Sequence, residues 1–260
     1  MTMKIGIVLS GGGARGISHI GVLKALEEFG ITANCLAGTS AGSIVGSLYA
    51  YGYKPDKILE IVLATSLFKS MRPAWTLTGL LTLDGLRDVL LKYIPENSFE
   101  SLKVPMTIAA TDIRKGKGVY FTKGELIPAI LSSCCVPAVF NPIQFQECTF
   151  VDGGIVDNLP AASIRSQCDF LIGSHCNHIS EDVDVKNFRT VIERSLLIAI
   201  NGNTTVSKSL CDVLIEPPDV GKVSGFDLSK AKDLFEIGYQ FTKTHFKPED
   251  FRNYDKAAEF

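Results

Sequence analysis

The pentapeptide Gly38-Thr39-Ser40-Ala41-Gly42 has residue types and spacing suited to covalent chemistry. It lies between a short apolar run that ends at Ala37 and residues 43–49, whose composition is typical of a helix. A serine on a tight turn from strand to helix needs small neighbours, because its backbone is strained and other elements pass close to it. The pattern predicts a nucleophile elbow with Ser40 as the attacking residue. The alternative is a glycine-flanked turn without chemistry.

Residues 10–16 form a second glycine-rich segment, which follows the apolar run of residues 4–9. The Gly-x-Gly-x-x-Gly spacing that begins at Gly11 matches the dinucleotide-binding pattern. That pattern also requires an acidic residue after the second strand to bind the ribose, and this chain has neutral residues there. A P-loop is excluded as well, because Ile17-Ser18 stands where the motif has lysine followed by serine or threonine.

The property that remains for this loop is anion binding. Consecutive small residues at the start of a helix allow backbone N–H groups to converge on an anion. In an acyl-transfer enzyme this anion is the tetrahedral oxyanion. Arg15 would add a fixed positive charge, either to the oxyanion or to the loop itself, and the residue types leave both roles open.

A serine nucleophile needs a base, and the chain has four histidines. His175 and His178 follow an expected strand end, so the order Ser40, Asp152, His175 is one possible triad. The sequence separation between Asp152 and His175 is short for such a triad. Neither His19, in the helix after the glycine loop, nor the histidine of the closing helix has a context that indicates catalysis.

Asp152 is the better candidate for the base. It ends a predicted strand and is followed by Gly153 and Gly154, as expected where a carboxylate must approach another backbone loop. A carboxylate with an ordinary pKa of about 3.9 is a weak base at pH 7. It can still act if it contacts the serine hydroxyl directly in a partly dry site. The alternative is an aspartate that makes a turn before glycine.

Three motifs occur together: Gly-Gly-Gly-Ala-Arg-Gly at 11–16, Gly-Thr-Ser-Ala-Gly at 38–42 and Asp-Gly-Gly at 152–154. Their order and spacing resemble the signature blocks of the patatin-like phospholipases, in particular compact bacterial-type members. Residues 133–140 and 158–160 are also similar to segments of that family. The resemblance covers roughly residues 4–245.

The resemblance implies a patatin-type fold and a Ser-Asp dyad without histidine. By position, Ser40 would be the nucleophile and Asp152 the base. The oxyanion hole would be formed by the loop at Gly11, Gly12 and Gly13, with Arg15. The glycines that support the elbow and the aspartate loop would be Gly38, Gly42, Gly153 and Gly154.

The activity implied is hydrolysis of lipid acyl esters, phospholipids included, through an acyl-serine intermediate that needs no metal or organic cofactor. Two alternatives stay open: a histidine-dependent esterase acting on small soluble esters, and a lipid-binding or regulatory protein of the same fold with low turnover. The head group, the acyl position and the oligomeric state are not determined by these residues.

The order of elements, strand, glycine loop, helix, strand, elbow and helix, predicts an α/β fold with a mainly parallel central sheet between helices, in three layers. We expect a single domain over residues 1–260. Predicted helices are 55–63, 84–94 with Asp84 as N-cap, 126–133, 188–206 and 228–245. Further predicted strands are 104–113, 118–121, 143–151, 168–174 and 212–216.

Composition limits the partners of this chain. Its 260 residues carry a formal net charge of -2 and a pI of about 6.1, which does not favour nucleic acid. The seven cysteines are scattered, and the Cys134-Cys135 pair lacks the spacing of a zinc site. They indicate reduced thiols and, with no signal peptide evident, a cytoplasmic protein.

Residues 67–81 are apolar without a clear period and contain the only tryptophan, Trp75. Core packing is the ordinary explanation of such side chains. The alternative is an apolar entrance through which lipid reaches Ser40. No uncharged segment approaches the roughly 20 residues of a membrane-spanning helix, so any membrane contact is expected to be peripheral.

Overall fold

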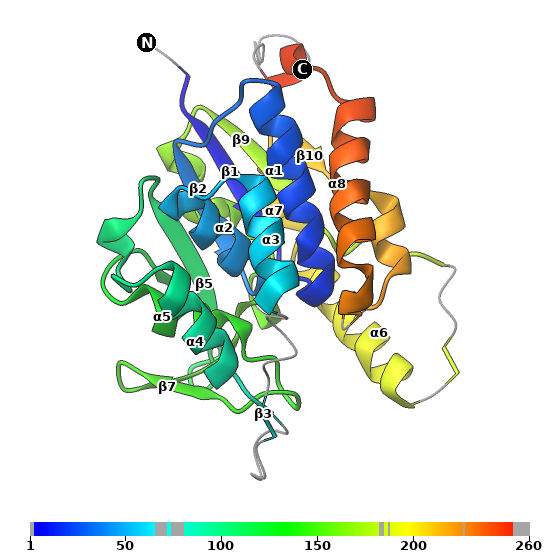
Figure 1. The fold of residues 1–260 in the computed structure, drawn as a ribbon. Helices are drawn as coiled ribbons and strands as arrows, with labels where there is room; N and C mark the ends of the chain where they lie inside the picture. The colour runs from blue at the N-terminus through cyan, green and yellow to red at the C-terminus, as the bar shows by residue number, and fades with distance from the viewer. Residues whose placement is uncertain are drawn as a thin grey trace.

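A computed structural model describes residues 3–65, 72–73, 81–181, 185–186, 188–225 and 227–251 of the chain. Its centre is a sheet of eight strands in the order β10-β9-β1-β2-β5-β8-β7, with β6 also paired to β5 (Figure 1). The strands are β1 (Ile5–Leu9), β2 (Cys35–Thr39), β5 (Met106–Asp112), β6 (Lys117–Phe121), β7 (Ile143–Phe145), β8 (Cys148–Asp152), β9 (Phe170–Ser174) and β10 (Val213–Ile215). A short antiparallel ribbon, β3 (Arg72–Pro73) with β4 (Leu81–Thr82), is separate.

The sheet is parallel from β10 to β5, and β6, β8 and β7 continue it as antiparallel strands. The predicted α/β class with a mainly parallel sheet is therefore confirmed. The helices are α1 (Ser18–Glu28), α2 (Ala41–Tyr51), α3 (Pro55–Thr65), α4 (Asp84–Tyr93), α5 (Leu126–Cys134), α6 (Phe188–Gly202), α7 (Thr205–Ser209) and α8 (Ala231–His245).

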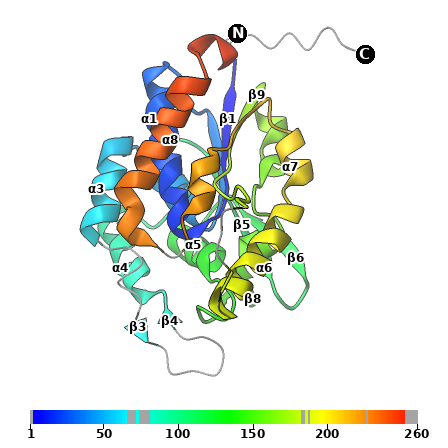
Figure 2. The ribbon, with the colours of Figure 1, turned by 90° about the vertical axis from the view of Figure 1, so that its right-hand side faces the viewer.

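The two faces of the sheet are covered unequally. Figure 2 shows α1, α3 and α8 on one side of β1 and α7 on the other. Alternate residues of β1 follow this division: Ile7 and Leu9 belong to the large hydrophobic cluster, whereas Val8 belongs to a smaller cluster. Because both faces are buried, the strand is a continuous apolar run instead of an alternating one.

Two predicted elements are wrong in extent. The segment 143–151 is not one strand but the hairpin β7–β8, which turns at Gln146 and Glu147 with φ of 47° and 62°. Neither residue is the glycine or asparagine that normally marks such a turn. The predicted helix 188–206 is two helices, α6 and α7, separated by residues 203 and 204. The Asn203 side chain, at this break, donates a hydrogen bond to the Gly154 carbonyl.

Asp84 is not the N-cap of α4. Leu83 occupies that position without a side-chain cap, and Asp84 lies in the first turn of the helix. An acidic residue is favourable there because it interacts with the helix dipole. Most of the apolar segment 67–81 lies outside the described residues. Across the described chain, no helix has both the length and the apolar content needed to cross a membrane.

Candidate active site

Ser40 lies at the junction between β2 and α2, where the chain reverses direction. Its backbone has φ of 49° and ψ of -121°, a conformation that is rare and costly for any residue except glycine. A side chain at Gly42 would collide with the Leu9 carbonyl of β1. The elbow is therefore possible only with a small residue beside the strand, as the motif requires.

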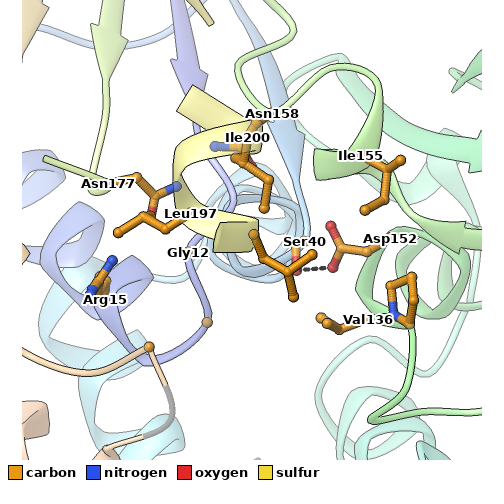
Figure 3. A pocket seen from close by; sticks show the side chains of 14 residues that line it. Gly12, Arg15, Ser40, Val136, Asp152, Ile155, Asn158, Asn177, Leu197 and Ile200 are labelled. Atoms are coloured by element: carbon orange, nitrogen blue, oxygen red, sulfur yellow. Dashed lines mark hydrogen bonds between the residues drawn. The ribbon is translucent and has the colours of Figure 1, made fainter. Parts of the chain in front are cut away.

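Ser40 Oγ donates a hydrogen bond of 2.6 Å to Asp152 Oδ2, and both side chains are buried (Figure 3). The sheet explains how residues so far apart in sequence meet. Thr39 pairs with Ala109 of β5, and Asp152 pairs with the next residue, Ala110. Because β6 pairs with residues 108–112 of β5, the strands β2 and β8 share the other edge of β5. The ends of β2 and β8 are therefore placed against the same part of β5.

Asp152 is 6% exposed, and its second carboxylate oxygen, Oδ1, accepts a hydrogen bond of 2.8 Å from the Gly154 N–H. Burial raises the pKa of Asp152 to about 6, against the opposing effect of the hydrogen bonds from Ser40 and Gly154. Asp152 is thus a stronger base than an ordinary aspartate, and it remains mostly ionised at pH 7. Such a group can accept a proton from the serine hydroxyl.

The glycine loop has two unpaired backbone donors in residues that line the pocket at Ser40. Among the described residues, no hydrogen bond involves the N–H of Gly12 or Gly13, and both residues line this pocket. Gly11, which we expected to contribute as well, donates its N–H to the Asn158 carbonyl at 3.1 Å. The loop can therefore bind an anion with two N–H groups.

Gly13 has a conformation that other residues adopt only under strain. Its φ is 58°, and a side chain there would collide with the Gly225 carbonyl. That carbonyl also accepts a hydrogen bond of 2.7 Å from the Ala14 N–H. Arg15 braces the same loop, because its Nε donates to the Val223 carbonyl at 2.6 Å.

None of the four histidines, all of which lie in the described chain, hydrogen-bonds to Ser40 or Asp152. His19 is buried between Ser174 Oγ and the Ser10 carbonyl, and burial lowers its pKa to about 4. It is therefore neutral and connects the glycine loop to β9. His175 Nδ1 contacts Glu216 Oε1 at 2.9 Å, away from Ser40 and Asp152.

The pocket at Ser40 has a volume of about 120 Å³. Its apolar lining comes from the segment after α5, from the loop after Asp152 and from α6: Val136, Pro137, Ile155, Leu196, Leu197 and Ile200. Figure 3 shows Leu197 and Ile200 of α6 on the same side of the pocket as Asn158 and Asn177. The role of α6 as a wall of this pocket was not predicted from sequence, although its apolar residues 196, 197 and 200 have helical spacing.

In the described part of the chain, no group of three or more His, Cys, Asp or Glu residues could hold a metal ion. The cysteines near the site are also not activated. Burial raises the pKa of Cys134 well above its usual range and that of Cys135 to about 12, so both remain thiols. The carboxylate that accepts the hydrogen bond from Ser40 Oγ is Asp152.

Several known proteins are similar to this chain in sequence. An uncharacterized NTE family protein of Mycobacterium tuberculosis is 34% identical over 164 residues, which is 62% of this chain and 45% of that protein. The human patatin-like phospholipase domain-containing protein 6 is 27% identical over 93% of this chain, and lysophospholipase NTE1 of Saccharomyces cerevisiae is 25% identical over 91%. This chain spans only 20% and 16% of those two proteins.

The fold is also found among solved structures. VipD from Legionella pneumophila superimposes with a TM-score of 0.54 at 15% identity, over 94% of this chain and 68% of VipD. The family model described as patatin-like phospholipase matches residues 7–164, a range that contains the glycine loop, Ser40 and Asp152. The chain therefore belongs to the patatin-like phospholipase family.

Proposed function

We propose that this chain hydrolyses acyl esters of lipids with a Ser40–Asp152 dyad. The observation that carries the proposal is the 2.6 Å hydrogen bond from a serine in a strained elbow to a buried carboxylate, beside an apolar pocket. Because Asp152 has a raised pKa and no histidine between it and the serine, it can act as the general base itself.

In the first half of the reaction, Asp152 removes the proton from Ser40 as Oγ attacks the ester carbonyl carbon. The carbonyl oxygen becomes the oxyanion of the tetrahedral intermediate and accepts hydrogen bonds from the N–H groups of Gly12 and Gly13. When the intermediate collapses, the bond to the alcohol breaks, and protonated Asp152 gives its proton to the leaving oxygen. The acyl group is then esterified to Ser40.

In the second half, a water molecule replaces the alcohol. Asp152 removes one of its protons, and the oxygen attacks the acyl carbon through the same oxyanion arrangement. Collapse of the second intermediate releases the fatty acid, and Asp152 returns the proton to Ser40 Oγ. Donors fixed in advance by the glycine loop lower both barriers, because they need little reorganisation when the charge develops.

The substrate class follows from the lining of the pocket. Six apolar side chains surround the reacting groups, so the pocket favours a hydrocarbon chain over a polar acyl group. The family and the lysophospholipase name of the yeast relative are consistent with a phospholipid or lysophospholipid ester. We propose these lipids as substrates.

The proposal is tested with a fluorophosphonate probe, which forms a stable adduct with an activated serine. We expect one adduct, at Ser40, and no adduct in a folded Ser40→Ala variant. The same variant should lose hydrolysis of lysophospholipid by several orders of magnitude, as expected for loss of a nucleophile. An adduct on another serine, or an active Ser40→Ala protein, would contradict the proposal.

We further propose that α6 makes a peripheral contact with the lipid surface. One stripe of this helix lines the pocket, and another is apolar and exposed, with Phe188 82% exposed. Other large apolar residues of α6 that are exposed are Val191, Ile192 and Ile198. Insertion of such side chains at a bilayer interface contributes roughly 1 kcal/mol each, enough for weak and reversible binding.

A double variant, Phe188→Ser with Ile192→Ser, tests this contact. We expect about a 30-fold loss of activity on vesicles and little change on a soluble short-chain ester, since about 2 kcal/mol of interfacial binding is removed. Val206→Ser is the matched control, because Val206 is 72% exposed but lies on α7. Equal losses on both substrates, or an equal effect of Val206→Ser, would contradict the proposed contact.

A further inference from the structure

The last turn of α5 and the residue after it contact the backbone of both reacting residues. Ser133 Oγ accepts a hydrogen bond of 2.7 Å from the Ser40 N–H. The Cys135 carbonyl accepts one of 2.9 Å from the Asp152 N–H. One helix end therefore joins the backbone of the elbow after β2 to that of the last residue of β8.

The Ser133 hydroxyl has a second partner in the sheet. It donates to the Ala109 carbonyl of β5 at 2.6 Å, and Ser133 is completely buried. A hydroxyl has one proton, so this group donates to Ala109 and accepts from Ser40. Thr39, the last residue of β2, pairs with Ala109 of β5. The N–H of the following residue, Ser40, is connected to β5 through the Ser133 hydroxyl.

The backbone of Ser40 depends on such contacts. Its φ of 49° is unfavourable for serine, and a conformation of this kind persists only where the surroundings hold it in place. Without the Ser133 hydroxyl, the Ser40 N–H and the Ala109 carbonyl would both lose their bridging partner inside the protein. Relaxation of the elbow to recover hydrogen bonds would move Ser40 Oγ.

We propose that Ser133 is a positioning residue that holds the Ser40 backbone so that Oγ stays within hydrogen-bonding distance of Asp152. This inference rests on the proposed role of Ser40 as the nucleophile. Because the Ser40 N–H is already bonded to Ser133, the oxyanion would accept its hydrogen bonds from the N–H groups of Gly12 and Gly13.

The chain contains a matched control beside Ser133. Ser132 is the preceding residue of α5 and is also completely buried. Its Oγ has no hydrogen-bond partner among the described residues. Replacing Ser132 with alanine therefore removes the same atom from the same helix without breaking a bridge.

The test compares Ser133→Ala with Ser132→Ala in ester hydrolysis, at a temperature at which both variants are folded. We expect Ser133→Ala to lower kcat by about 10- to 100-fold, with KM within about twofold of wild type, because a small displacement of the nucleophile slows the chemical step. Ser132→Ala should keep kcat within about twofold. The unfolding temperature of each variant is measured in parallel.

A folded Ser133→Ala protein with kcat within twofold of wild type would overturn the inference, as would an equal loss in Ser132→Ala. If Ser133→Ala does not fold, Ser133→Cys replaces it, because a thiol is a weaker donor and acceptor at the same position. A loss of at least fivefold in kcat then supports the inference, and a smaller one contradicts it. Activity in Ser40→Ala would refute the proposed function instead, whatever Ser133 does.

Discussion

Asp152 and Glu216 are two carboxylates partly or wholly removed from water, and their hydrogen-bond partners differ so that their pKa values shift in opposite directions. Asp152 accepts hydrogen bonds from the Ser40 hydroxyl and the Gly154 N–H, and no ion pair to it is found among the described residues. Glu216 is bound by His175 at 2.9 Å and by Lys208 Nζ at 2.9 Å. The first carboxylate has neutral partners, and the second is paired with a cation.

The pKa values of the two groups follow from these partners. Burial raises the pKa of Asp152 to about 6. Burial also acts to raise that of Glu216, but His175 and Lys208 outweigh it, and the pKa falls to about 2. Burial lowers the pKa of His175 against the effect of its hydrogen bond to Glu216, and Lys208 adds a positive charge at 2.9 Å from the same carboxylate. A carboxylate retains basicity when it is buried without a cation, and it becomes a structural anchor when one is present.

The largest effect expected from this contrast is on catalysis. Asp152→Asn should lower kcat roughly 10³-fold or more, because the amide cannot accept the serine proton. Combined with Ser40→Ala it should add little further loss, since the two groups act as one unit. The measurement is steady-state hydrolysis of a lysophospholipid by each single variant and the double variant.

Glu216→Gln and His175→Gln are the controls for this prediction. Both should leave kcat within a few-fold of wild type in folded protein, because neither residue contacts Ser40 or Asp152. If His175→Gln abolished turnover while Asp152→Asn did not, the histidine-dependent esterase would be the correct alternative. Additive losses in the Ser40 and Asp152 double variant would also count against the dyad.

The next effect concerns the glycine loop. Gly13→Ala should lower kcat about 10²-fold, because the added methyl group meets the Gly225 carbonyl and displaces an oxyanion donor. Gly116→Ala is the matched control: Gly116 has φ of 61°, but a methyl group there meets nothing within 4 Å. Both variants strain the backbone, and only the first should lose activity. Equal activities would exclude donation by the loop at Gly13.

A smaller effect is expected on stability, with opposite signs at the two carboxylates. Asp152 has a folded-state pKa above its unfolded value of about 3.8, so its contribution to stability falls as pH rises from about 4 to about 6. Asp152→Asn should therefore raise the free energy of unfolding at pH 8 by roughly 1–3 kcal/mol. Urea denaturation measures this change.

Glu216 has a lowered pKa, so its contribution is present above about pH 4.5 and is lost as pH falls toward 2. Glu216→Gln should lower the free energy of unfolding at pH 8 by roughly 2–3 kcal/mol, because it leaves Lys208 without its partner. The same sign for both variants in urea would mean that the two carboxylates do not differ as described.

The sequence was sufficient to predict the α/β class and to place Ser40 on an elbow, because local glycine patterns determine such turns. It also favoured Asp152 over His175 as the base, which stays a prediction, and only the structure gives the hydrogen bonds of the two residues. The prediction of one strand over 143–151 was wrong, because the hairpin there turns at Gln146 and Glu147, two residue types that do not normally indicate a turn.

Features that depend on tertiary contacts were not predictable from local pattern. The bond between Ser133 and the Ser40 N–H joins residues 93 positions apart. The wall that α6 adds to the pocket depends on the path of the chain after β9. Periodicity identifies an apolar stripe on a helix, but it does not show what that stripe covers.

The measurement that tests the dyad most directly is the pH dependence of fluorophosphonate labelling at Ser40. The second-order rate constant should rise with pH, reach half its maximum near pH 6 and then remain constant to pH 8, because only ionised Asp152 accepts the serine proton. In Asp152→Asn the rate should be low and should not show this transition. A transition near pH 6 that persists in Asp152→Asn and disappears in His175→Gln would contradict the account.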